Sequence, residues 1–110
     1  MPDSRRNHYR VIYPFAERPA FRVGWSSFEV VECSESGLRY EVGEHRSPMM
    51  KAEVAGRIVF RSGESIDVVG DVVRLQDGFV ALTLRPPGIP FALVIREQRY
   101  LRGKGFQVTE

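Results

Sequence analysis

The strongest constraint on the fold is an alternation of apolar and polar residues in short runs. In the first run, Phe21 and Val23 alternate with Arg22 and Gly24. A period of two residues with β-branched and aromatic side chains is typical of strands that are buried on one face. Similar runs follow along the chain, at residues 28–31, 38–41, 57–61, 66–73 and 80–84. The sequence therefore predicts a mainly β fold with about six strands.

Turn-forming residues separate several of these runs, which favours antiparallel neighbours in the sheet. The turns contain serine, aspartate and glycine, at Ser36-Gly37, Ser62-Gly63-Glu64 and Asp77-Gly78. Strands this short must close on themselves or be covered, because exposed edges pair with other chains. A small antiparallel β-barrel over about residues 18–85 meets this requirement.

One stretch after the predicted barrel has the features of a helix. Pro86-Pro87-Gly88 stops the last strand, and Pro90 suits a first helical position. Apolar residues then recur at spacings of three and four, at Phe91, Val94, Ile95 and Leu101. This pattern predicts a C-terminal α-helix over about residues 90–102 that packs against the barrel. The 110 residues are enough for a single domain spanning 1–110.

Few residues have the spacing that catalysis or metal binding requires. His8 and His45 are the two histidines, and neither is spaced as a metal ligand with another histidine or cysteine. Asp67 and Asp71 lie on a strand of ordinary alternation, where paired carboxylates more often form a solvated face than an acid–base pair. We therefore expect no enzymatic activity, no metal and no cofactor.

The sequence shows no sign of a membrane-spanning or exported segment. No apolar run approaches the roughly 18 residues that a bilayer span needs. Charged residues and prolines interrupt the N-terminal region where a signal peptide would have its apolar stretch. A single cysteine, Cys33, excludes an intrachain disulfide. We expect a cytoplasmic protein that does not insert into membranes.

Two residues beside the predicted strands are assigned to structure rather than to function. Cys33 follows the apolar alternation and has no histidine near it in the sequence, so we expect a buried structural thiol. Trp25 lies between two predicted strands. A lone tryptophan there is more often an anchor in the core or at its rim than a surface on which a base stacks.

The basic residues are unusual in kind and in distribution. Fourteen of the 16 are arginine, although the net charge is only +2. Codon bias produces such a composition, but arginine also suits phosphate and guanine, because its guanidinium forms two parallel hydrogen bonds. Basic segments at both ends flank an acidic region at residues 29–53. Duplex nucleic acid prefers a continuous basic face, so a small anion bound by a local arginine cluster fits better, and we expect no nucleic-acid partner.

The N-terminal stretch "RRNHYR" is the most concentrated arginine cluster. Arg5, Arg6 and Arg10 lie in a polar segment without periodicity, which predicts a flexible arginine-rich arm over residues 1–10. The pattern R-x-x-x-R alone carries little information, because about 1.7 such pairs are expected by chance in a chain of this arginine content. A second sequence motif is needed before the arm can be interpreted as part of a binding site.

That second element is a turn motif within "VVECSESGLRY" at residues 30–40. Glu32-x-Ser34-x-x-Gly37 begins 22 residues after Arg10, at the end of a predicted strand. In this pairing the sequence resembles the PilZ family of bacterial cyclic di-GMP receptors, which combine an R-R-x-x-x-R arm with a D/N-x-S-x-x-G turn. The resemblance covers nearly the whole chain, from the arm through the barrel to the terminal helix.

The resemblance implies that Arg5, Arg6, Arg10, Glu32, Ser34 and Gly37 bind cyclic di-GMP. The chemistry is compatible: arginine reads the O6 and N7 acceptors of guanine or pairs with phosphate, and a carboxylate accepts from the N1–H and N2–H edge. Ser34 adds a hydroxyl, and Gly37 permits a positive φ or a close backbone approach. A receptor of this kind relays the nucleotide level to an effector protein, here unidentified.

Glu32 departs from the family pattern, which has Asp or Asn at this position. The extra methylene moves the carboxylate outward, and one misplaced bidentate contact weakens binding by about 1–3 kcal/mol. Glu35 adds a further negative charge that does not help a dianionic ligand. The sequence leaves open a second interpretation, a PilZ-like barrel that no longer binds the nucleotide and acts as a protein-interaction module.

Overall fold

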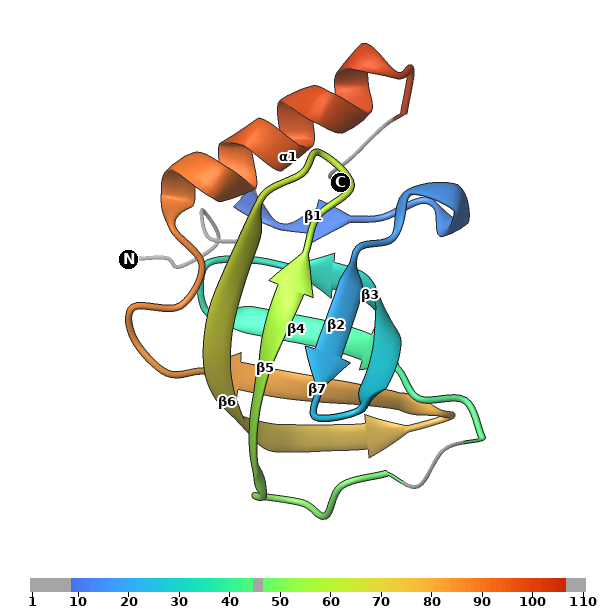
Figure 1. The fold of residues 1–110 in the computed structure, drawn as a ribbon, viewed down its shortest axis with the longest axis vertical. Helices are drawn as coiled ribbons and strands as arrows, with labels where there is room; N and C mark the ends of the chain where they lie inside the picture. The colour runs from blue at the N-terminus through green and yellow to red at the C-terminus, as the bar shows by residue number, and fades with distance from the viewer. Residues whose placement is uncertain (1–8, 45–46, 107–110) are drawn as a thin grey trace, which may run out of the picture.

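Six antiparallel strands close into a β-barrel, as the alternation predicts (Figure 1). The computed structural model describes residues 9–44 and 47–106. The order around the barrel is β3-β2-β5-β6-β7-β4, and β4 pairs back to β3. The strands are β2 (Ala20–Val23), β3 (Ser26–Cys33), β4 (Gly37–Glu41), β5 (Glu53–Val59), β6 (Ser65–Gln76) and β7 (Phe79–Leu84).

Two short elements before the barrel were not expected from the sequence. The strand β1 (Val11–Ile12) pairs antiparallel with the end of β3, with Val11 opposite Cys33. A single 3-10 turn, η2 (Phe15–Glu17), follows it. Elements of two or three residues are too short to show a period. Because β1 pairs with the end of β3, the chain that enters β1 lies beside the predicted turn motif.

The barrel interior is filled by the inward-facing residues of the alternating strands. Phe21 and Tyr40 meet edge to face, with their ring centroids 4.9 Å apart. Cys33 is buried, as expected, and burial raises the pKa of its thiol to about 12, so it stays protonated. The expectation for Trp25 is wrong, because Trp25 is fully exposed in the turn between β2 and β3. Position between two strands does not distinguish a core anchor from a turn residue.

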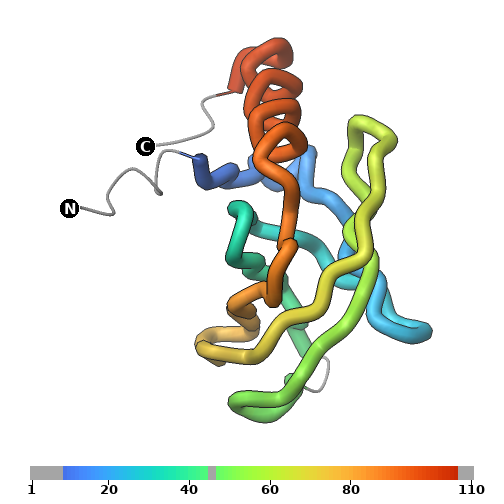
Figure 2. Tube along the Cα trace, turned by 90° about the vertical axis from the view of Figure 1, so that its left-hand side faces the viewer, coloured from blue at the N-terminus to red at the C-terminus, as the bar shows by residue number. Residues whose placement is uncertain are grey.

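The helix α1 (Phe91–Gly103) lies across one end of the barrel, next to β1 (Figures 1 and 2). Its buried residues include Val94 and Leu101, as the apolar spacing predicts, and also Glu97, whereas Phe91 of the same apolar pattern is exposed at the first turn. The hydroxyl of Tyr13 donates to Glu97 Oε1 at 2.6 Å, and that of Ser62 donates to Oε2 at 3.0 Å. Within the described ranges, no helix is long and apolar enough to cross a bilayer.

Candidate functional site

The turn between β3 and β4 holds the predicted motif in a tight conformation. The amide of Ser34 donates to the carbonyl of Gly37 at 2.9 Å, which closes the turn. A Cβ at Gly37 would lie 3.3 Å from Ser34 Oγ, although the backbone there is not in the positive-φ region. Gly37 is therefore suited to this position by close approach, which leaves room for the Ser34 hydroxyl.

Arg10 reaches this turn from the N-terminal side of the chain. Its Nη1 lies 3.4 Å from Glu32 Oε2, across a separation of 22 residues. The pairing of β1 with β3 fixes the backbone immediately after Arg10, and Gln98 Nε2 donates to the Arg10 carbonyl at 3.4 Å. One arginine of the predicted arm is thus held between the motif and α1.

Arg39 is a second arginine at the site, and sequence reasoning missed it. It lies directly opposite Glu32 in the β3–β4 ladder, and its Nη2 is 3.7 Å from Glu32 Oε1. Its guanidinium also stands over the ring of Phe79 at 5.2 Å. The carboxylate of Glu32 therefore lies between two guanidinium groups, both of them partly exposed to solvent.

Two β-bulges place these side chains on the outer face of the barrel. In β3 the register shifts between Val30 and Glu32, so that Val31 is the extra residue and Glu32 faces outward beside Arg39. In β6 the shift lies between Val72 and Arg74, and the extra residue Val73 is 51% exposed. Bulges commonly redirect side chains next to binding sites. An apolar doublet, Val30-Val31 or Val72-Val73, stands at each bulge and breaks the alternation there.

The side chains line an open groove of about 740 Å³ over β4, β6, β7 and the β3–β4 turn. Of the predicted site residues within the described ranges, all four line it: Arg10, Glu32, Ser34 and Gly37. Arg39 and Arg74 line it as well, so three guanidinium groups and one carboxylate give the groove a positive balance. A groove of this size and charge accommodates an anion as large as a nucleotide.

The other predicted site residues, Arg5 and Arg6, lie outside the described residues, as does most of the predicted arm. No group of three or more histidine, cysteine, aspartate or glutamate side chains within residues 9–44 and 47–106 is arranged to hold a metal ion. Asp67 accepts two hydrogen bonds from Arg57, at 2.8 and 3.1 Å. These bonds lower the pKa of Asp67, which suits a surface ion pair.

Comparison with known proteins identifies a shared architecture. No protein-family model matches the sequence, and no curated protein matches it. A crystal structure of an uncharacterized protein from Legionella is similar, with a TM-score of 0.60 and 15% sequence identity over 88% of this chain and 98% of that chain. The likeness is one of fold. At this identity it says nothing about what either protein binds.

Proposed function

We propose that this protein is a cytoplasmic receptor for cyclic di-GMP that relays the nucleotide level to a partner protein. The observation that carries the proposal is the contact between Arg10 and Glu32, in one groove with Ser34 and Gly37. Arg10 belongs to the R-x-x-x-R arm, and the other three residues form the turn motif. Their convergence is what a joint ligand site requires.

The groove offers the groups that a cyclic dinucleotide needs. Arg10, Arg39 and Arg74 supply guanidinium forks for two phosphates and for the O6 and N7 acceptors of a guanine. Ser34 supplies a short hydroxyl within the same groove. Both guanidinium contacts to Glu32 are long, at 3.4 and 3.7 Å, so exchange of either contact for one to a phosphate costs little.

A second candidate function rests on the same contacts. Glu32 lies between Arg10 and Arg39 and already neutralises part of their charge. If the carboxylate keeps that position, it competes with the phosphates for both guanidinium groups. The chain would then be a PilZ-like barrel without nucleotide affinity that serves as a protein-interaction module.

The contacts of the arm with α1 support a relay. Gln98 donates to the backbone carbonyl of Arg10, and the ring of Tyr9 meets that of Phe91 at 4.8 Å. A ligand that draws Arg10 away from Glu32 therefore acts on a segment that also contacts the helix. A partner protein that contacts α1 and the arm would then sense the nucleotide through a change in their positions.

The proposal is tested by calorimetric titration of the purified protein with cyclic di-GMP, with GTP and duplex DNA as controls. We expect saturable binding of cyclic di-GMP alone. Arg10→Ala should weaken it by about 5- to 150-fold, the loss of one bidentate contact. The matched control is Arg22→Ala, an exposed arginine on β2 outside the groove. Absence of cyclic di-GMP binding to the parent protein would favour the interaction module.

A further inference from the structure

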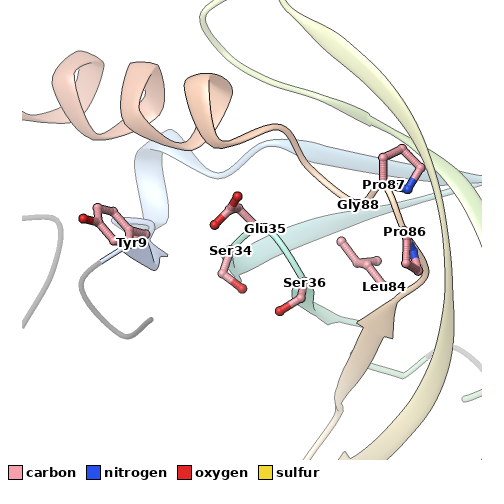
Figure 3. Close-up of a pocket in the computed structure, with 8 residues that line it drawn as sticks. All are labelled: Tyr9, Ser34, Glu35, Ser36, Leu84, Pro86, Pro87 and Gly88. Carbon is pink, nitrogen blue, oxygen red and sulfur yellow. The ribbon is translucent and has the colours of Figure 1, made fainter. Parts of the chain in front are cut away.

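A second cavity, drawn in Figure 3, adjoins the arginine groove at the β3–β4 turn. It measures about 580 Å³ and shares Ser34 and Ser36 with the groove. The ring of Tyr9 lies at one side, the loop at Pro86–Pro87 lies at the other, and Glu35 lies between them. The cavity and the groove are therefore neighbours that meet at this turn.

The last residue of β7 and the loop that follows it bind the backbone of this turn. The amide of Ile89 donates to the carbonyl of Glu35 at 3.0 Å, and that of Leu84 donates to the carbonyl of Ser36 at 2.8 Å. Gly88 has a φ of +67°, and a Cβ there would lie 2.1 Å from the Glu35 oxygen, so only glycine allows this approach. With its backbone carbonyls engaged, the turn presents the Glu35 and Ser36 side chains outward.

The chemistry of the second cavity complements that of the groove. Glu35 is the one charged side chain among its lining residues in the described part of the chain. No hydrogen bond from a described residue occupies its carboxylate, which can only accept. Tyr9, Pro86 and Pro87 add flat apolar walls. This cavity suits a planar ring that offers hydrogen-bond donors, whereas the groove suits phosphates and acceptor edges.

We infer that cyclic di-GMP, bound in the groove as proposed above, extends over the β3–β4 turn. One guanine lies in the groove, and the second lies in the cavity between Tyr9 and the Pro86–Pro87 loop. The N1–H and N2–H groups of this second guanine donate to the Glu35 carboxylate. Adenine presents an acceptor nitrogen in place of N1–H, so Glu35 selects guanine over adenine. The negative charge of Glu35, which repels the phosphates, would in this arrangement determine specificity for guanine.

The inference rests on the proposed function, and titrations of matched variants separate the two. The parent protein, Glu35→Ala and Glu44→Ala are titrated with cyclic di-GMP and with cyclic di-AMP. Glu44 is an exposed glutamate in the turn after β4, at the opposite end of that strand from the motif. We expect Glu35→Ala to weaken cyclic di-GMP binding by about 5- to 150-fold and to reduce the preference over cyclic di-AMP. Glu44→Ala should match the parent.

The results of these titrations distinguish the second-guanine site from the receptor proposal. If the parent binds cyclic di-GMP and Glu35→Ala binds it equally well, the second-guanine site is wrong and the receptor proposal stands. If the parent binds no cyclic di-GMP, both fail. Circular dichroism confirms that each variant is folded. A second readout is the nuclear Overhauser effect between ligand protons and the Tyr9 ring or the Gly88 α-protons in the saturated complex, and its absence would also overturn the inference.

Discussion

The two proposed functions, nucleotide receptor and interaction module, differ most in the role that they give to Glu32. Its two ion pairs are partly exposed, and pairs of this kind contribute about 0–1 kcal/mol. A bidentate contact to the donor edge of guanine is worth about 1–3 kcal/mol. Each arginine contact is therefore weaker than the ligand contact that would replace it, and we expect the carboxylate to act as a ligand-binding group.

We predict that Glu32→Ala weakens cyclic di-GMP binding by about 5- to 150-fold, measured by calorimetry. Glu32→Asp, which restores the shorter side chain of the PilZ pattern, should retain or increase the affinity. Glu29→Ala is the matched control, because Glu29 lies on the same strand and pairs with Arg18 at 3.2 Å outside the groove. Tighter binding by Glu32→Ala would identify Glu32 as a competitor for the arginines.

The helix α1 carries a buried carboxylate, that of Glu97, on the side that faces the barrel. Glu97 is 1% exposed, and burial raises the pKa of its carboxyl above the ordinary value for glutamate. A carboxyl of this kind binds its proton more tightly in the folded state than in the unfolded chain. Its contribution to stability is fully present below the unfolded-state pKa and is lost as the pH rises through the raised folded-state pKa.

Glu97→Gln tests this directly, because the amide keeps the shape and the hydrogen-bonding capacity without the titration. We predict that the free energy of unfolding of the variant, relative to the parent, increases as the pH rises from about 4.3 toward neutrality and above. Urea unfolding across a pH series measures it, with the exposed Glu44→Gln as control. A difference that does not change with pH would show that Glu97 does not titrate differently on folding.

Most elements of this fold are predictable from the sequence because alternation over four or more residues is a strong signal. The hairpin turn at Asp77-Gly78 was also predicted, and both residues adopt the positive φ that a tight hairpin requires. The strand β1 was not predicted, because its two residues, Val11 and Ile12, are too few to show a period. Its position depends on pairing with a strand some 20 residues away, which is a tertiary effect.

The candidate site was predictable in part, for a similar reason. The motif residues of the turn are local in sequence, and Arg10 was identified through the resemblance of the arm and the turn together to the PilZ pattern. Arg39 and Arg74 were missed, because they reach the groove through strand register and through the bulge at Val73. The apolar doublets indicate a bulge only once the neighbouring strands are known.

Closure of the barrel creates the groove. β4 pairs with β7 and β7 pairs with β6, so that Arg39 and Arg74 both lie opposite Ala81 although 35 positions separate them in the chain. The Legionella protein has the same fold at 15% identity, so the architecture tolerates wide variation in sequence. Function in such a fold depends on the side chains that line one outer face.

Binding of cyclic di-GMP in this groove is tested by amide chemical-shift mapping of the isotope-labelled protein. We predict that cyclic di-GMP causes saturable shifts at Arg10, Ser34, Gly37 and Arg74, which line the groove. Amides in the turn beyond the far end of β4, such as that of Gly43, should remain unchanged. Shifts centred away from the β3–β4 turn, or no saturable shifts with cyclic di-GMP, would exclude nucleotide binding in this groove.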